Sequence, residues 1–144
     1  MAPGSQPHVF EVTNDIGEVT RLSEALSALW AKHGMPADGE MDATLALEEM
    51  LSNVIRHGHQ PGQKADIQVR VSFEPECYEI EIMDGGIPYN PLLREDPDLH
   101  APLAQRKPGG LGVYLVKQLA DELRYDYRDG RNHLVFRKTV GRLS

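Results

Sequence analysis

The chain has 144 residues, of which 40% are hydrophobic and 26% are charged. This length and composition predict a soluble globular protein, and no apolar run approaches the roughly 20 residues that a membrane span requires. Fifteen basic residues against 22 acidic ones give a formal net charge of −7, which disfavours broad attraction to the nucleic-acid backbone. We therefore expect neither a membrane protein nor a direct nucleic-acid binder.

The N-terminal segment MAPGSQP has neither a basic start nor an apolar stretch, so it does not resemble a secretory signal. We expect a flexible tail over residues 1–7, a single domain over residues 8–144, and a cytoplasmic protein. Cys77 is the only cysteine, which excludes an intrachain disulfide.

The first half of the chain predicts one strand and two helices. Residues 8–13 alternate apolar and polar side chains, as a half-buried strand does. Asn14 and Asp15 offer capping groups for a helix of about five turns that Gly34 and Pro36 end. A second helix begins near Asp38, whose carboxylate suits the N-cap position, and runs to His57.

The second half predicts two hairpins separated by a long loop and a third helix. The runs 67–73 and 78–83 alternate as two strands of one hairpin, and residues 123–128 and 133–138 form the other. Between the hairpins, residues 84–112 carry many glycines and prolines, and a loop of this length inside a compact domain is usually functional. Helical spacing resumes over residues 111–120.

This order of elements, β-α-α-β-β-loop-α-β-β, predicts an α+β two-layer sandwich. Hairpin-linked strands favour a mixed, mostly antiparallel sheet, and the three helices would cover one of its faces. The other face of the sheet would then be mostly polar.

The second helix carries a polar stripe beside its core-facing stripe. Glu49, Asn53 and His57 are four residues apart, so their side chains stack along one side of the helix, drifting toward the apolar edge near His57. An amide oxygen suits Mg²⁺, and a carboxylate can accept a proton from a reacting hydroxyl. Taken alone, the spacing is also that of an ordinary solvated helix face. The core-facing stripe is Leu47, Met50, Leu51, Val54 and Ile55.

Two glycine-rich segments flank the long loop. The first follows a strand and reads Asp84-Gly85-Gly86-Ile87-Pro88, in which glycines allow close backbone approach to a ligand and Asp84 can accept a hydrogen bond from an exocyclic amine. The second, residues 108–112, opens a helix whose free amides and positive dipole end suit a phosphate. Each segment alone is equally compatible with a simple chain reversal.

Taken in order, the helical stripe and the two glycine-rich segments resemble the three sequence boxes of the GHKL ATPase superfamily. The resemblance covers nearly the whole chain after the tail. The short length and the form Asp-x-Gly-x-Pro-Tyr-Asn-Pro over residues 84–91 are similar to anti-sigma-factor serine kinases of the RsbW type. The resemblance implies a Bergerat-type ATP-binding fold.

Carried over residue by residue, the resemblance implies roles for the helix and the first glycine-rich segment. Glu49 would be the general base that orients the attacking hydroxyl, and Asn53 would ligate the Mg²⁺ that bridges the phosphates of ATP. Asp84 would accept a hydrogen bond from the adenine amino group. The other nucleotide-binding positions implied here are His57, Gly86 and Pro88.

In the second glycine-rich segment the resemblance implies phosphate binding, under a mobile lid formed by residues 91–108. Arg106 and Lys107 are equal candidates for the cation that neutralises charge on the transferred phosphoryl group. The chain departs from relatives that place an arginine directly beside the lid glycines, because Pro108 stands there. The implied phosphate-binding residues are Gly109, Gly110, Leu111 and Gly112.

The resemblance therefore implies an ATP-dependent serine protein kinase and anti-sigma factor. Its expected partners are a sigma factor, an anti-anti-sigma protein with a STAS domain as substrate, and a second copy of the chain in a homodimer. The alternative is a regulatory module that binds nucleotide and sequesters a partner without phosphoryl transfer. The presence of both Glu49 and Asn53 favours the kinase, because a pure binder needs no base.

Two other classes of the superfamily are disfavoured. The catalytic domain of a histidine kinase would be joined to a helical hairpin with a phospho-acceptor histidine, and a gyrase-like ATPase would need a transducer domain. We expect neither in a chain of this length.

Overall fold

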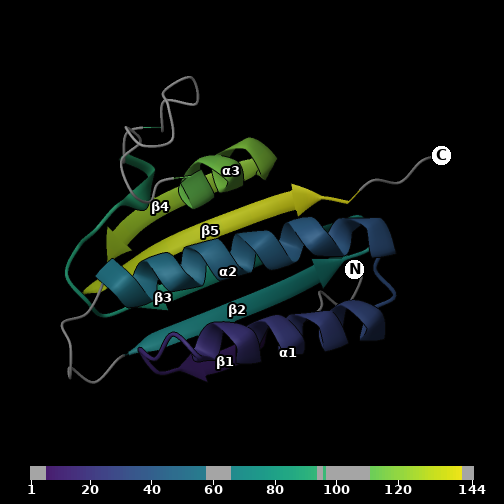
Figure 1. Cartoon of the computed structure of the whole chain (residues 1–144), viewed down its shortest axis with the longest axis horizontal. Helices are drawn as coiled ribbons and strands as arrows, with labels where there is room; N and C mark the ends of the chain where they lie inside the picture. Colours follow the sequence, from purple (N-terminus) through teal and green to yellow (C-terminus); the bar gives the residue numbers. More distant parts are fainter. Residues whose placement is uncertain (1–5, 58–65, 94–95, 97–110, 141–144) are drawn as a thin grey trace, which may run out of the picture.

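The computed structural model describes residues 6–57, 66–93, 96 and 111–140. It has two layers, with a sheet on one side and helices α1 (Glu18–Lys32), α2 (Glu40–His57) and α3 (Leu111–Leu119) on the other (Figure 1). The expected α+β two-layer sandwich is therefore confirmed. Short 3₁₀ turns, η1 (Ala37–Gly39) and η2 (Pro91–Leu93), precede α2 and follow the first glycine-rich segment.

The sheet has the strand order β1-β2-β3-β5-β4. Every pairing among the described strands is antiparallel, so this sheet is more uniform than the mixed one that we expected. Two-residue turns explain much of this, because they join β2 to β3 and β4 to β5 as tight hairpins. The strands are β1 (His8–Val12), β2 (Ile67–Glu74), β3 (Cys77–Asp84), β4 (Glu122–Arg128) and β5 (Arg131–Thr139).

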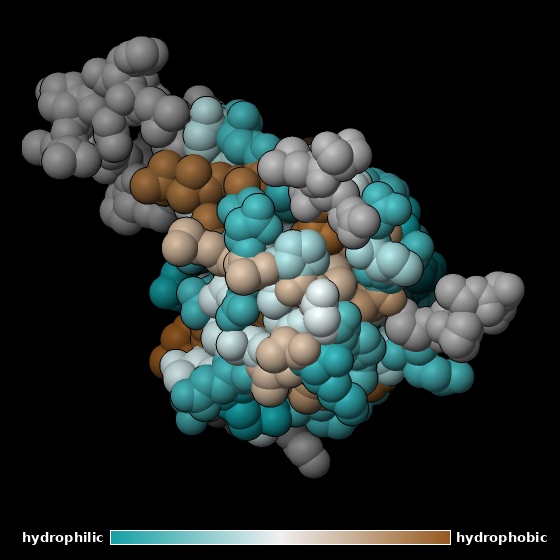
Figure 2. Space-filling view, turned by 90° about the vertical axis from the view of Figure 1, so that its right-hand side faces the viewer, coloured by the Kyte–Doolittle hydropathy of each residue, from teal (hydrophilic) through white to brown (hydrophobic). Residues whose placement is uncertain are grey.

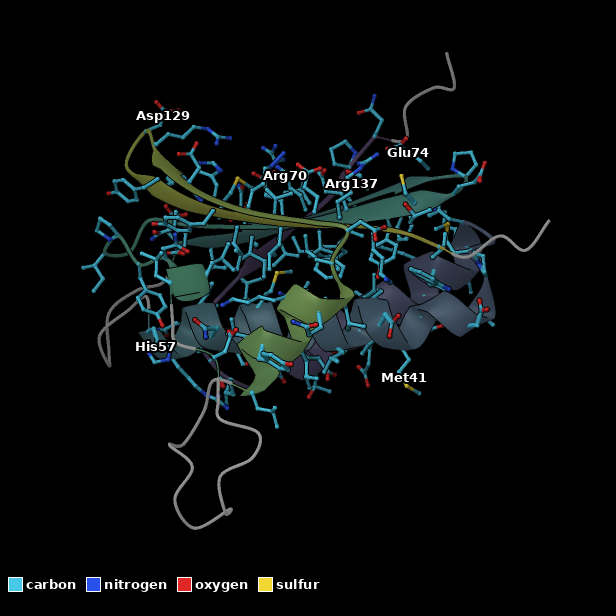
Figure 3. All side chains as sticks on the ribbon, turned by 90° about the horizontal axis from the view of Figure 1, so that it is seen from above. Met41, His57, Arg70, Glu74, Asp129 and Arg137 are labelled. Atoms are coloured by element: carbon cyan, nitrogen blue, oxygen red, sulfur yellow. The ribbon has the colours of Figure 1, made fainter. Side chains whose placement is uncertain are left out.

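The two faces of the sheet differ in character, as the alternation of the strands predicts. In β2, the side chains at positions 67, 69, 71 and 73 are buried under the helices, and those between them point to the opposite face. Figure 3 shows this opposite face, on which Arg70, Glu74 and Arg137 lie away from the helices. Arg137 pairs there with Glu74 at 2.9 Å. The outer face is therefore polar, as expected.

The hydrophobic core lies between the helices and the inner face of the sheet. Helix α1 contributes Leu22, Leu26 and Trp30, which are spaced by four and fully buried. The indole of Trp30 packs edge-on against Tyr78 and donates a hydrogen bond to the carbonyl of Pro36 at 2.8 Å. Trp30 is therefore a core residue and not an exposed partner contact. From α2, the expected stripe is buried at Leu47, Met50, Leu51 and Ile55, and Val54 packs against it.

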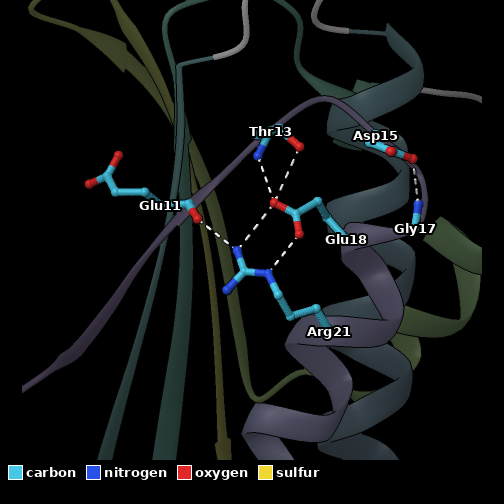
Figure 4. A network of polar contacts seen from close by, with 6 residues as sticks. All are labelled: Glu11, Thr13, Asp15, Gly17, Glu18 and Arg21. Carbon is cyan, nitrogen blue, oxygen red and sulfur yellow. Dashed lines mark hydrogen bonds and ion pairs between the residues drawn. The ribbon is translucent and has the colours of Figure 1, made fainter.

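Helix α1 begins at Glu18, two or three residues later than a cap at Asn14 or Asp15 would place it (Figure 4). The Asp15 side chain does not cap the helix, because it accepts a hydrogen bond from the amide of Gly17 at 2.9 Å. Glu18 instead accepts from the amide of Thr13 at 2.9 Å and pairs with Arg21 at 2.6 Å. These contacts join the end of β1 to the first turn of α1.

A few large hydrophobic side chains remain exposed on the described part of the molecule. They include Met41 on α2, Ile87 and Leu93 near the first glycine-rich segment, and Leu111 and Leu115 on α3. Figure 2 shows one side of the molecule, on which hydrophilic groups predominate and the hydrophobic ones form small patches. None of the described helices has the length and apolar character needed to cross a bilayer.

Candidate active site

The three residues of the polar stripe on helix α2 differ in how deeply they are buried. Glu49 is half-buried, Asn53 is only 8% exposed, and His57 is exposed at the end of the helix (Figure 3). The stripe therefore does not drift toward the apolar edge near His57, and this expectation was wrong. Its middle member is the most buried, because β3, β5 and α3 surround that part of α2, whereas the last turn lies beyond them.

Two adjoining hollows meet at Asn53. One is lined by Glu49, Asn53 and residues of α3. The other is lined by Asn53, Asp84 and Asn132. Pro91 and Leu134 border both hollows. Three of the residues proposed from sequence, Glu49, Asn53 and Asp84, are thus brought into one continuous region.

The side-chain oxygen of Asn53 is buried at the point where the hollows meet. Within the described residues, Oδ1 has no hydrogen-bond partner. An unpaired buried acceptor costs about 1–3 kcal/mol in desolvation. An amide oxygen without a partner is the kind of hard donor that Mg²⁺ takes. The residues present therefore fit a magnesium ion at this position.

Glu49 and Gly112 lie in direct contact where α2 meets α3. A Cβ atom built on Gly112 would overlap Oε1 of Glu49 and lie 2.5 Å from its Cδ. Any side chain at position 112 would therefore displace the carboxylate. The contact also places the Glu49 carboxylate beside the first turn of α3, where the helix dipole favours negative charge.

Asp84 ends β3 and is held firmly at the inner face of the sheet. It is 3% exposed, and its Oδ1 accepts hydrogen bonds from the amide of Gly86 at 2.8 Å and from Nδ2 of Asn132 at 3.1 Å. A carboxylate held by N–H donors is well placed to accept a further bond from a ligand amine. The backbone amide of Gly86 thus helps to hold the Asp84 carboxylate in place.

Asn132 is a site residue that the sequence analysis missed. It lies directly opposite Asp84 in the β3–β5 pair and is 5% exposed. The sequence placed residues 129–132 in a turn, but only Asp129 and Gly130 form it, both with positive φ. The Asp-Gly pair is the signal that could have started the strand at position 131, although it does not indicate that Asn132 pairs with the end of β3.

His57 lies at the edge of the second hollow. Its ring stacks on that of Tyr89, with centroids 5.2 Å apart and planes 27° apart. Tyr89 itself lines the hollow. Pro88 is exposed beside it and does not line either hollow. His57 therefore adjoins the site through Tyr89.

The phosphate-binding segment is described only from α3 onward. Arg106, Lys107, Gly109 and Gly110 lie outside the described residues, as does most of the expected lid. Leu111 starts α3 with its side chain exposed, and Gly112 follows it against Glu49. On the same helix, Lys117 pairs with Asp96 at 3.0 Å, which ties α3 to the lid segment.

Residues 12–138 match the histidine kinase-like ATPase domain family. The chain belongs to this family. This match places the chain among the GHKL ATPases and agrees with the order of the three sequence boxes along the chain.

The chain is similar to several serine kinases. It is 34% identical over 91 residues to the serine/threonine-protein kinase BtrW of Bordetella bronchiseptica, an alignment that covers 63% of this chain and 64% of BtrW. It is 26% identical over 116 residues to the serine-protein kinase RsbW of Bacillus velezensis, covering 78% of this chain and 71% of that protein. The chain thus spans just under two thirds of BtrW.

The fold has a counterpart among solved structures. The crystal structure of the RsbU and RsbW domains of Rv1364c from Mycobacterium tuberculosis matches with a TM-score of 0.67. The match covers 97% of this chain and 34% of that longer chain, at 15% sequence identity. It therefore supports the Bergerat-type fold of this chain.

Proposed function

We propose that this protein is an ATP-dependent serine protein kinase and an anti-sigma factor of a bacterial partner-switching module. Its substrate would be a serine of an anti-anti-sigma protein with a STAS domain, and its second partner a sigma factor. The observation that carries this proposal is the placement of Glu49, Asn53 and Asp84 along two hollows that meet at Asn53. The similarity to RsbW and BtrW kinases supports it.

ATP would lie along these hollows with its base at the Asp84 end. Asp84 would accept a hydrogen bond from the adenine amino group, and the backbone near Gly86 would lie beside the base. The ring of Tyr89, stacked on His57, would bound this part of the site. By resemblance, Pro88 and Leu111 would also contact the nucleotide, from outside the two hollows, which neither of them lines.

At the other end of the site, Glu49 would accept the proton of the substrate serine as its oxygen attacks the γ-phosphorus. The bond between the γ-phosphorus and the bridging oxygen of ADP breaks in the same step. Asn53 would hold Mg²⁺ through its Oδ1, and the bound ion neutralises negative charge on the phosphates. Gly109, Gly110 and Gly112 would donate backbone amides to the phosphates, with Arg106 or Lys107 as the added cation.

The proposal includes a homodimer and a cytoplasmic location. Both rest on the resemblance to anti-sigma kinases, and sedimentation of the purified chain with and without ATP tests the first. A chain that sediments as a monomer at micromolar concentration in both states would contradict the dimer.

The test of the kinase is phosphoryl transfer from ATP labelled at the γ-phosphate. The purified chain, Mg²⁺ and a candidate anti-anti-sigma protein with a STAS domain should give phosphoserine, located by phosphopeptide mapping. Glu49→Ala should abolish the label. A matched control is Glu48→Ala, because Glu48 neighbours Glu49 on α2 but bonds to Ser23 of α1 at 2.7 Å. Binding of ATP with no transfer by the unchanged chain would favour the regulatory module without catalysis.

A further inference from the structure

Asn132 uses the full hydrogen-bonding capacity of its side-chain amide. Nδ2 donates to Oδ1 of Asp84 at 3.1 Å and to the carbonyl of Ile87 at 2.9 Å. Oδ1 accepts from the amide of Tyr89 at 3.0 Å and from the hydroxyl of Tyr125. A carboxamide offers two donor hydrogens and two acceptor lone pairs, and all four are matched here.

The Tyr89 amide, Asp84 and the Ile87 carbonyl fix which way the Asn132 amide points, and the Tyr125 hydroxyl adds a hydrogen bond to its oxygen. With the amide reversed, its NH₂ group would face the Tyr89 amide and the Tyr125 hydroxyl, and its oxygen would face Asp84 and the Ile87 carbonyl. The reversed amide would thus bring a donor against the Tyr89 donor and an acceptor against two acceptors. Because Asp84 and Asn132 are buried, that arrangement is unfavourable.

The fixed Asn132 amide in turn determines how the Asp84 carboxylate is oriented. Asp84 and Asn132 are 3% and 5% exposed, so little water reaches the bond between them. Donation from Asn132 and from the Gly86 amide stabilises the carboxylate as a hydrogen-bond acceptor and sets the direction in which it faces. A ligand group at this carboxylate must therefore be a donor.

We propose that Asn132 and Tyr125 are positioning residues that set the base selectivity of the nucleotide site. Tyr125 anchors the side-chain oxygen of Asn132 by a hydrogen bond, and Asn132 holds Asp84 so that a purine with an amino group at position 6 is favoured over one with a carbonyl oxygen. A carbonyl there would place an acceptor against the carboxylate. This inference rests on the proposed function, because it concerns the same nucleotide site.

The test compares the binding of ATP and inosine triphosphate, which carries a carbonyl at position 6, by isothermal titration calorimetry. The unchanged chain should prefer ATP by at least about 100-fold. Asn132→Ala should lower this preference about tenfold, mainly by weakening ATP, and Tyr125→Phe should lower it by a smaller factor. If either variant weakens both nucleotides equally, the residue supports the fold only and the proposal is wrong.

Tyr78→Phe is the matched control for Tyr125→Phe. Tyr78 is a fully buried tyrosine of the inner face, whereas Tyr125 is partly buried, and the Tyr78 hydroxyl has no hydrogen-bond partner within the described residues. This substitution should leave both affinities unchanged. A loss of preference equal to that of Tyr125→Phe would overturn the role of the Tyr125 hydroxyl.

A second variant, Asn132→Asp, gives a readout that a purely structural role would not produce. Its carboxylate would replace the donor 3.1 Å from Asp84 Oδ1. At low pH a proton shared by the two carboxylates restores a donor to Asp84, and at high pH the two charges repel. ATP affinity should therefore fall at least about tenfold between pH 5.5 and 8, relative to the unchanged chain.

The ATP affinity of the unchanged chain, measured over the same pH range, is the control for the other titratable groups near the site. These are His57, Tyr89 and Tyr125. A profile of Asn132→Asp that follows the unchanged chain would overturn the proposal. If the unchanged chain binds no ATP, the proposed function fails. If it binds ATP with equal affinity for the inosine nucleotide, the selectivity proposal alone fails.

Discussion

Gly112 faces the carboxylate of Glu49 so closely that any other residue at its position would require the carboxylate to move. The pair joins two segments more than 60 residues apart in the chain, the middle of α2 and the start of α3. Their contact links the expected phosphate-binding segment to the expected general base. Several consequences of this arrangement can be measured.

Gly112→Ala should impair phosphoryl transfer. The added Cβ would overlap Glu49 Oε1, so either the carboxylate or the start of α3 must shift. A displacement of about 1 Å at a reacting group can cost roughly 100-fold in rate, and we expect a loss of that order. Gly17→Ala is the control, since its Cβ would meet its nearest atom, Asp15 Oδ1, at an ordinary 3.4 Å. Equal activity of both variants would show that the Glu49 contact is unimportant.

Glu49→Gln should separate catalysis from binding. The amide keeps the size of the side chain but cannot accept the serine proton, so the rate should fall about 100-fold to 10,000-fold. The dissociation constant for ATP should change by less than about threefold, because Glu49 acts on the substrate hydroxyl in this mechanism. Single-turnover kinetics and a nucleotide titration measure the two quantities. A variant that transfers phosphate at the original rate would remove Glu49 from the reaction.

Asn53→Leu should stabilise the protein in the absence of nucleotide while abolishing its response to Mg²⁺-ATP. The substitution removes a buried oxygen that lacks a partner among the described residues, which favours the folded state by about 1 kcal/mol. The corresponding rise in melting temperature is about 3 °C. Added Mg²⁺-ATP should raise the melting temperature of the unchanged chain but not that of the variant. A clear loss of stability in the variant without nucleotide would instead mean that the oxygen is satisfied in the native protein.

The contacts of Glu18 predict a stability effect that depends on pH. Its bonds to Arg21 and to the Thr13 amide lower the pKa of Glu18 from 4.5 to about 2. Because the folded-state pKa is the lower one, the stabilisation is complete above pH 4.5 and is lost as the pH falls toward 2. Discounted for solvent screening of a surface pair, Glu18→Gln should cost about 1 kcal/mol at pH 7.

Urea unfolding at pH 7, 5 and 3 measures this effect, with the exposed Glu24→Gln on the same helix as control. The difference between Glu18→Gln and the unchanged chain should shrink toward pH 3, whereas the control should remain within about 0.5 kcal/mol of the unchanged chain. A deficit of Glu18→Gln that stays constant over this range would contradict the role of the charged carboxylate.

The parts of the fold that depend on local pattern could be predicted from sequence. Alternation in β2 and β3 and the spacing of Leu22, Leu26 and Trp30 gave the layers and their inner faces. The start of α1 could not be predicted, because Asn14 and Asp15 were both candidates for the N-cap position. In the structure Asp15 instead accepts a hydrogen bond from the amide of Gly17. That choice depends on the contacts of Glu18 with β1 and Arg21.

The site was predictable where its residues share one short segment and not where they meet through the sheet. Glu49 and Asn53 share a helix stripe, but the burial of Asn53 depends on α3 and β5, which come much later in the chain. Asn132 reaches Asp84 only through the β3–β5 register. No local pattern contains that register.

The most direct test of the account is a crystal structure of the chain with Mg²⁺ and a non-hydrolysable ATP analogue. We predict that the adenine amino group donates to Asp84, that Asn53 Oδ1 ligates the ion, and that Glu49 lies beside the γ-phosphate. The amide of Gly112 should face the phosphates. A nucleotide bound elsewhere, or one whose base does not contact Asp84, would contradict the central claim that the hollows meeting at Asn53 form one nucleotide site.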